Sequence, residues 1–159
     1  MVRHAPCFVE IFWENFNMPS QMYGKALESL LSQVPSIDFD TDTIKVALVG
    51  AGYSRNTATN GDQFYTALGT NVVGTPQTLA SKTVTGGTFD AADVTFTAVT
   101  GAQVTQLVLY KDTLTASNSP LIAVIDSAST GLPITPNGGD ITVSFDNGTN
   151  RIFRLVNPA

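Results

Sequence analysis

Short strand-like segments separated by turn residues fill most of this chain, and they limit its fold more than any other feature. The clearest run extends from Ser81 to Asp126, where Thr and Val alternate between clusters of Gly, Asn, Asp and Pro. Alternation with a period of two is typical of β-strands with one buried face, and these turn residues commonly end such strands. The spacing predicts a mainly all-β fold, either an antiparallel β-sandwich or a barrel-like domain.

The strongest strand predictions lie at residues 43–49, 94–99, 104–112 and 120–126. The first two alternate between apolar and polar residues, as strands with one buried face do. The last two contain continuous apolar runs, which are typical of central strands that are covered on both faces.

A hairpin is predicted near the end of the chain. Residues 140–146 alternate cleanly, and the sequence NGTN follows at 147–150. Asn-Gly is a strong signal for a tight turn between antiparallel strands. We therefore expect residues 140–146 to pair with residues 151–156.

Residues 20–33, SQMYGKALESLLSQ, form the best predicted helix. Ser20 is the expected N-cap, and Pro35 is expected to stop the helix. Gly24 costs about 1 kcal/mol relative to Ala inside a helix, so this helix is expected to depend on packing. Its predicted apolar face comprises Met22, Ala26, Leu27, Leu30 and Leu31.

Residues 1–18 are rich in aromatic side chains and lack a clean period. Such a segment either folds back on its own domain or acts as an arm that docks on another subunit. We favour the arm, because a terminal segment this apolar is expected to be covered by a partner. The sequence thus predicts an N-terminal apolar arm with a short helix (residues 1–37) and a β-sandwich domain (residues 38–159). The predicted partner-binding residues are Phe8, Phe12, Trp13, Phe16, Met22, Leu27 and Leu31.

Charged residues make up only 13% of the chain, against roughly a quarter in an average soluble domain. The net charge of −5 and the scattered basic residues argue against a nucleic-acid partner, which needs clustered Lys and Arg. No apolar run approaches the roughly 20 residues of a membrane helix, and Glu10 and Glu14 interrupt what would be the apolar part of a signal peptide. A surface with few charges suits close packing against neighbours, because few charges must be desolvated on contact.

The chain has few side chains suited to nucleophilic catalysis. A nucleophile needs an adjacent base, and the one His4 and the one Cys7 are three residues apart in the apolar N-terminal segment. We interpret this pair as incidental, and a single cysteine gives no internal disulfide. The sequence contains no phosphate-binding loop, dinucleotide fingerprint or metal-ligand cluster. We therefore expect no cofactor, and we predict that the protein is not an enzyme.

Three aspartates invite a metal-site interpretation. Asp38, Asp40 and Asp42 have the spacing of the first ligands of a calcium-binding loop. Thr43 and Val49 stand where that loop needs Gly and Glu. We therefore interpret the aspartates as a polar lead-in to the first long strand.

Asp90 and Asp93 resemble a carboxylate pair of the kind that glycosidases use. Such enzymes keep one carboxylic acid protonated in a cleft, opposite a second carboxylate. Two aspartates in a turn more often accept hydrogen bonds from backbone N–H groups. We favour the turn role.

Six blocks between residues 38 and 156 share their order and spacing with a known group of proteins. The blocks are DFDTDTIKVALVGAGY (38–53), GTFDAADVTFTAVTG (87–101), LVLYKDT (107–113), SPLIAVID (119–126), GLPITPNGGDITVSFDNG (131–148) and the closing IFRL (152–155). Together they resemble a widespread group of small virion proteins of tailed bacteriophages. The first 35 residues depart from the usual short start of that group.

The resemblance implies a β-rich structural protein of a phage particle. The expected function is that of a capsid decoration (cement) protein, which binds the shell of major capsid protein and stabilises it. Such a protein acts through multivalent contacts of a homo-oligomer, for example a trimer. The expected location is the capsid exterior of the virion, after synthesis in the cytoplasm of the bacterial host. Two alternatives are a tail or head–tail connector protein and a host-glycan binding module.

Overall fold

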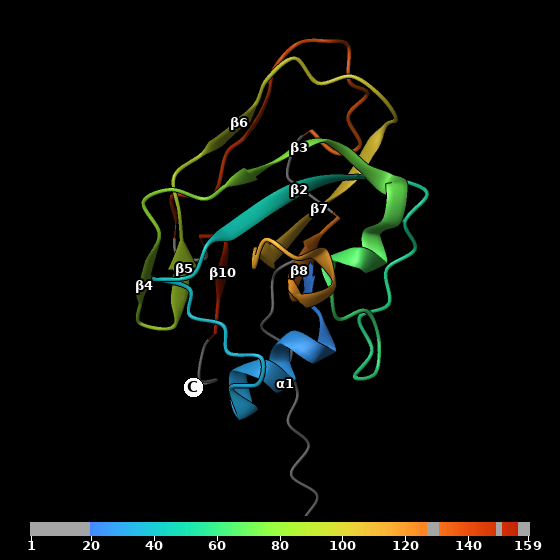
Figure 1. Ribbon diagram of the computed structural model, residues 1–159. Coiled ribbons are helices and arrows are strands. Elements are labelled where there is room, and N and C mark those ends of the chain that lie inside the picture. Colours follow the sequence, from blue (N-terminus) through green and yellow to red (C-terminus); the bar gives the residue numbers. More distant parts are fainter. Residues whose placement is uncertain (1–19, 127–130, 149–150, 156–159) are drawn as a thin grey trace, which may run out of the picture.

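The computed structural model describes residues 20–126, 131–148 and 151–155, which form a mainly β structure (Figure 1). Every strand pair among these residues is antiparallel, which confirms the predicted all-β fold class with a short helix near its start. The helices are α1 (Gly24–Ser32) and two 3₁₀ helices, η1 (Tyr65–Asn71) and η2 (Ala116–Asn118). The strands are β1 (Ser20–Met22), β2 (Ile44–Gly50), β3 (Val72–Thr78), β4 (Thr83–Thr85), β5 (Thr88–Asp90), β6 (Val94–Phe96), β7 (Val104–Lys111), β8 (Leu121–Ile125), β9 (Ile141–Val143) and β10 (Phe153–Arg154).

A five-stranded sheet forms the centre of the molecule, with strand order β1-β8-β7-β2-β3. Strands β2, β7 and β8 are buried along most of their length. Their continuous apolar runs allow both faces of the sheet to be covered, as predicted for residues 104–112 and 120–126. Figure 1 shows α1 below this sheet and strands β4, β5 and β10 to its left.

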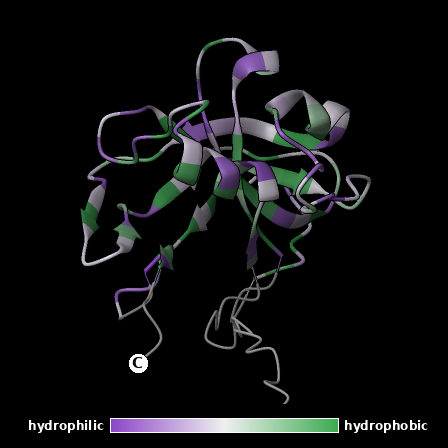
Figure 2. Cartoon of the chain, turned by 90° about the horizontal axis from the view of Figure 1, so that it is seen from below, coloured by the Kyte–Doolittle hydropathy of each residue, from purple (hydrophilic) through white to green (hydrophobic). Residues whose placement is uncertain are grey.

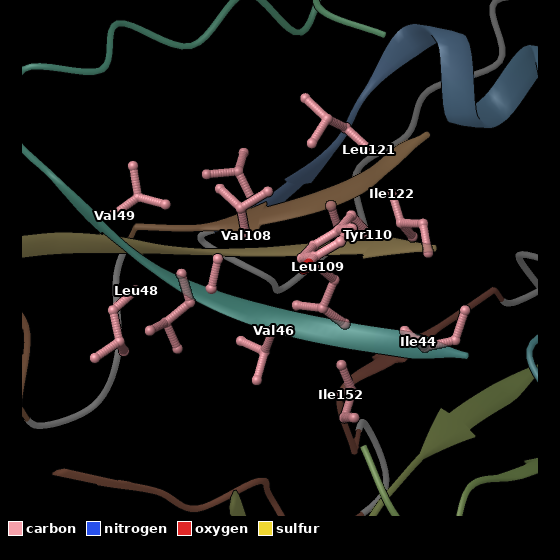
Figure 3. Close-up of a cluster of buried hydrophobic side chains, with 14 of the residues drawn as sticks. Ile44, Val46, Leu48, Val49, Val108, Leu109, Tyr110, Leu121, Ile122 and Ile152 are labelled. Atoms are coloured by element: carbon pink, nitrogen blue, oxygen red, sulfur yellow. The ribbon is translucent and has the colours of Figure 1, made fainter. Parts of the chain in front are cut away.

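The hydrophobic core occupies both faces of the central sheet (Figure 3). Strand β2 places Ile44, Val46 and Leu48 on one face, and Ile152 lies on that side. Val108 of β7 points to the opposite face, the side on which α1 lies. All five side chains are buried. The alternation of the strands thus divides the core into one layer beneath α1 and one beside β10.

The remaining strands form two small sheets, one with order β10-β5-β4 and one that pairs β6 with β9. The predicted hairpin between residues 140–146 and 151–156 is therefore wrong. Strand β9 pairs with β6 through Val94↔Val143, and β10 pairs with β5 through Phe153↔Phe89. The Asn-Gly signal indicates a turn, but it does not determine which strand each flanking segment joins.

Three aromatic rings explain why the last strand joins β5. Phe39, Phe89 and Phe153 have ring centroids between 4.9 and 5.3 Å apart. Phe89 and Phe153 are almost fully buried, and Phe39 comes from the segment that leads into β2. Aromatic pairs at this separation are attractive beyond the area that they bury. The cluster, named here the phenylalanine cluster, fastens the three-stranded sheet to that segment.

The predicted N-cap at Ser20 is wrong, because residues 20–22 form strand β1 instead. Met22 pairs with Ala123 of β8, so this short strand satisfies backbone groups at the edge of the five-stranded sheet. The helix begins at Gly24, and Tyr23 is its N-cap without a side-chain hydrogen bond. The need to cover the β8 edge outweighs the capping preference of a serine.

The predicted apolar face of the helix is only partly correct. Helix α1 buries Ala26 and Ser29 and leaves Leu27 and Leu31 exposed. Ser29 can be buried because its hydroxyl donates to the carbonyl oxygen of Lys25 at 2.8 Å. The exposed leucines leave an apolar helix surface with no partner among the described residues.

Gly24 is expected to be intolerant of a side chain, although it stands in a helix. A Cβ atom there would lie 2.7 Å from both the Ala58 carbonyl oxygen and Thr59 Cα. The clash is expected to cost about 1–3 kcal/mol, whereas Ala gains roughly 1 kcal/mol in helix propensity. We expect the clash to dominate, so that Gly24→Ala lowers the free energy of unfolding. Urea unfolding would measure the change, with Ser32→Ala at an exposed position of the same helix as control. A stabilised Gly24→Ala variant would contradict the expected clash.

The predicted domain boundary between residues 37 and 38 stays a prediction. In the described part of the first unit, β1 adds a strand to the five-stranded sheet, and α1 contacts β8. Residues 20–32 thus contribute to the same hydrophobic core as the later strands.

Candidate interaction surface

A groove runs between α1, the segment that follows it, and the edge strand β4. Its volume is about 340 Å³. We name it the α1 groove; it is lined by Ser29, Leu30, Gln33, Ser36, Ile37, Asp38, Phe39, Asp40 and Val84. Its floor includes Phe39 of the phenylalanine cluster, so the groove is built directly on the core.

Exposed apolar side chains occur on α1, just after it and in the lining of the α1 groove. Leu31 is 89% exposed, Val34 75%, Val84 46% and Leu27 37%. Val84 lines the groove, Val34 follows the lining residue Gln33, and Leu27 and Leu31 stand one turn apart on α1. Figure 2 shows the chain from this side, coloured by hydropathy. A cluster of exposed aliphatic side chains marks a surface suited to contact with another protein.

The end of α1 explains why Val34 is exposed. Gln33 adopts a left-handed conformation with φ of 58° and donates its backbone N–H to the Ser29 carbonyl oxygen at 2.7 Å. This conformation is a common helix terminator, and it turns the chain sharply out of the helix. The residue that follows is thereby directed away from the core, although it is apolar.

Residues 36–40 form the opposite wall of the groove, and two half-buried lysines hold residues 36–42 in place. The Lys111 ammonium at the end of β7 lies 2.8 Å from Asp42 Oδ2 and donates to the Ser36 carbonyl oxygen at 2.9 Å. The Lys82 ammonium donates to the Asp42 carbonyl oxygen. Charge-assisted bonds of this kind are stronger than neutral ones. The groove is therefore a preformed feature of the folded chain.

The lining of the groove carries negative charge. Asp38 and Asp40 are its only charged residues, and both are exposed. The pKa of the Asp38 carboxyl is lowered, first by a hydrogen bond from the Thr41 side chain and then by the backbone N–H groups of Thr41 and Asp40. The groove thus combines apolar surface with an anionic rim.

The structure places the predicted partner-binding residues in three different situations. Phe8, Phe12, Trp13 and Phe16 lie outside the described residues. Met22 is buried in the core of its own chain, where it pairs with Ala123. Leu27 and Leu31 are exposed on α1, but neither lines the α1 groove.

Val34 and Val84 complete this surface and were not predicted from the sequence. Val84 lies in a short strand whose three residues are all exposed, between two threonines. Val84 faces the same side of the small sheet as its cross-strand partner Phe89, but it is covered only in part and remains 46% exposed. Only the three-dimensional arrangement brings Val84 next to the end of α1.

A polar cluster around Tyr23 and Tyr53 lies inside the molecule and has a structural role. The Tyr23 hydroxyl lies 2.9 Å from the Tyr53 hydroxyl, which donates to Asp62 Oδ2 at 2.7 Å. Asp62 Oδ2 also accepts the Asn56 backbone N–H, and Gln106 Nε2 donates to the Tyr53 carbonyl oxygen. Burial raises the pKa of Tyr23 to about 12, and burial also raises the pKa of Tyr53. These bonds fasten the loop after β2 to the start of α1.

The buried tyrosines predict a loss of stability at alkaline pH. The fold favours protonated Tyr23, whose pKa is about 12 in the folded chain, against roughly 10 when unfolded. The free energy of unfolding should therefore be constant below about pH 10 and fall above it, by up to about 1.4 kcal/mol per pH unit for this residue. Urea unfolding between about pH 8 and about pH 11, a range that spans the ordinary tyrosine pKa, would measure this. Tyr23→Phe should have a shallower alkaline slope, and equal slopes would contradict the assignment.

The carboxylate pair Asp90 and Asp93 has structural contacts. Asp90 Oδ2 lies 3.0 Å from the Arg151 guanidinium, and Asp93 Oδ1 accepts the Phe145 backbone N–H at 3.0 Å. Asp93 therefore supports the backbone, as favoured from the sequence. Asp90 forms an ion pair across the three-stranded sheet.

The described parts of the chain contain no group of three or more His, Cys, Asp or Glu side chains that could hold a metal ion. His4 and Cys7 lie outside the described residues. No helix within those parts is long and apolar enough to cross a membrane.

Two comparisons with known proteins gave no match. No protein-family model matches the chain, and no curated protein matches it. The α1 groove is therefore interpreted from its own geometry and chemistry.

Proposed function

We propose that this protein is a structural component of a tailed-bacteriophage particle, a capsid decoration (cement) protein. It binds the shell of major capsid protein on the capsid exterior and stabilises that shell through many copies. Its partners are the major capsid protein and further copies of itself. In this proposal the protein is not an enzyme and takes no cofactor.

The observation that carries the proposal is the exposed apolar surface of α1, of the residue that follows its C-cap and of the α1 groove. Leu27, Leu31 and Val34 leave aliphatic surface in water on and just after the helix, and Val84 does so in the groove lining. Removal of apolar surface from water contributes roughly 25 cal/mol per Å², so covering this surface favours association. The low charged fraction of the chain, 13%, lowers the cost of desolvation on contact.

Multivalency would allow such a small apolar surface to hold the protein on the capsid shell. A symmetric oligomer presents the same apolar surface several times, and each further contact forms at high effective concentration once the first has formed. A lattice of identical shell subunits offers matching repeats. The resemblance of residues 38–156 to small phage virion proteins agrees with this mechanism.

The copy number of the chain in purified virions tests the proposal. Quantitative mass spectrometry would compare it with the major capsid protein. A stoichiometry comparable to that of the shell protein is expected for a decoration protein. A ring-sized handful of copies would instead indicate a tail or head–tail connector protein, and absence from the particle would exclude both structural roles.

A further inference from the structure

We propose that the outer edge of strand β4 pairs with β4 of a second copy of this chain, antiparallel and with Val84 opposite Val84. The pairing joins two three-stranded sheets into one continuous sheet across a twofold axis. The inference deepens the proposed function, because it rests on the proposed homo-oligomer and identifies a contact between its copies. The backbone geometry of the hairpin, the sequence of the edge and its charges are separate observations that support it.

The hairpin of β4 and β5 directs the backbone groups of Val84 outward. The two-residue turn between these strands makes Thr85 and Thr88 a pair that exchanges backbone hydrogen bonds. Such pairs alternate along an antiparallel ladder with pairs that exchange none, and Val84 with Phe89 is the next pair. In agreement, the Phe89 carbonyl oxygen accepts the Ile152 backbone N–H at 3.1 Å on the β10 side. The N–H and carbonyl groups of Val84 therefore point away from β5.

The outer edge of β4 is open to a further strand. No strand pairs with it on that side among the described residues, and Figure 1 shows β4 at the margin of the molecule. Its three residues are all exposed and include no charge, proline or bulge, the features that commonly keep sheet edges from pairing. By contrast, edge strand β3 contains Pro76 and a register shift and contacts β6, and edge strand β10 contains Arg154.

The sequence of this edge favours a second copy as the added strand. Thr83-Val84-Thr85 reads the same in both directions, so an antiparallel pair centred on Val84 sets valine against valine and threonine against threonine. Threonine pairs across strands are stabilised by their hydroxyl groups. The chain already contains one such pair, Thr95 and Thr142, whose hydroxyl oxygens lie 3.0 Å apart. In the joined sheet, the Val84 N–H of each copy donates to the Val84 carbonyl oxygen of the other.

Exposure and charge agree with this register. Val84 is 46% exposed, and the matching valine covers it from the same face of the joined sheet. Lys82 is the nearest charged residue in sequence, and it comes opposite the uncharged Gly86 of the other copy. The two lysines are then four residues apart along the strands, about 13 Å. The Lys82 ammonium is also held by the Asp42 carbonyl oxygen of its own chain. No like charges oppose each other in the pairing.

The contact is small, because β4 pairs through three residues on each side. A standard interface uses roughly 20–30 residues from each partner. A single β4 pair is therefore weak, and it gains strength where other contacts hold the copies close together, as on a shell lattice. Disulfide trapping is suited to detecting such a weak contact.

Two cysteine variants of the full chain test the register, each with Cys7→Ser to remove the native thiol. One carries Thr83→Cys and the other carries Thr85→Cys. In the proposed register these two positions face each other across the copies in a pair that exchanges no backbone bonds. The Cα atoms of such a pair lie about 4.5 Å apart, within disulfide range. Each variant alone is the matched control, because its own cysteines are then offset by two residues, about 8 Å between Cα atoms and too far for a disulfide.

We expect the mixture of the two variants to form the mixed disulfide at least about tenfold faster than either variant alone forms its own, because pairing raises the local thiol concentration. The rates are measured under mild oxidation and separation without reductant. Equal rates, after correction for the statistics of mixing, would overturn the pairing of β4 between copies. Faster trapping of either variant with itself would overturn the proposed register.

A proline at the centre of the edge separates backbone pairing from chance collision. Val84→Pro removes an N–H that points away from β5, so it takes no hydrogen bond from the β4–β5 ladder. Added to both cysteine variants, it should slow the mixed disulfide to the control rate, with circular dichroism as the test of the fold. An unchanged rate in the folded protein would overturn backbone pairing, and the cysteine mixture decides the proposal by itself if the proline variant does not fold.

These measurements use the purified chain in solution and need no phage particle. Failure of the trapping experiment would overturn the β4 contact and leave the capsid role to the copy-number measurement. Absence of the chain from virions would overturn the capsid role and leave the β4 contact to the trapping experiment. The two proposals can therefore fail separately.

Discussion

Replacing Phe12 and Trp13 together with alanine is expected to abolish binding to the phage particle and to leave the β domain folded. Both residues belong to the proposed arm, which precedes β1 in the sequence. Truncation of an aromatic anchor commonly costs 2 kcal/mol or more, so two anchors account for about 4 kcal/mol, or roughly a 1,000-fold loss per copy. If the proposed multivalent binding holds, that loss applies to each copy in the oligomer.

Cosedimentation with particles that lack the protein would measure this effect, with circular dichroism and urea unfolding as tests of the fold. Leu114→Ala is the matched control, because Leu114 is the most exposed large apolar residue of the described chain. Light scattering of the free proteins adds a second comparison. A smaller oligomer for the double variant would assign the aromatic residues to the contact between copies. Wild-type particle binding by the double variant would disprove the arm hypothesis.

The central strands could be predicted from the sequence because their signal is local and redundant. Residues 104–112 and 120–126 contain apolar runs that suit only strands covered on both faces, and they became β7 and β8. Residues 43–49 alternate, and they became β2. In such segments, propensity and pattern favour the same structure as the packing does.

Strand pairing could not be predicted in the same way. The turn signal at 147–150 was compatible with a hairpin, yet β9 and β10 belong to different sheets. The choice depends on partners far away in the sequence, such as Phe89 for Phe153. The start of α1 shows the same limit, because β8 recruits residues 20–22 as a strand. Local capping preferences of about 1 kcal/mol are small beside such long-range contacts.

The candidate interaction surface was predictable only in part. Helical spacing identified Leu27 and Leu31 as apolar, but it assigned them to the same face as Ala26, which is buried. Spacing cannot tell which side of a helix a sheet will cover. Val34 and Val84 carry no local signal for exposure, because one follows a helix terminator and the other sits in an edge strand. The groove exists only where these elements meet.

Phe89→Ala is expected to produce the largest loss of stability of any single substitution considered. Phe89 is almost fully buried, and its ring packs against both Phe39 and Phe153 at 4.9 and 5.3 Å. Truncation of a buried phenylalanine typically costs about 3–5 kcal/mol, because the transfer free energy is lost and a cavity remains. Typical domains have only about 5–15 kcal/mol of stability in total. Urea unfolding monitored by circular dichroism would measure the change.

Val84→Ala is the matched control, because Val84 is the cross-strand partner of Phe89 but is partly exposed. Its truncation should change the free energy of unfolding by no more than about 0.5 kcal/mol. A loss below about 1 kcal/mol for Phe89→Ala would contradict the central position of the phenylalanine cluster. Because Phe39 rests on Phe89 and forms the groove floor, we expect Phe89→Ala to disturb the α1 groove even where the chain stays folded.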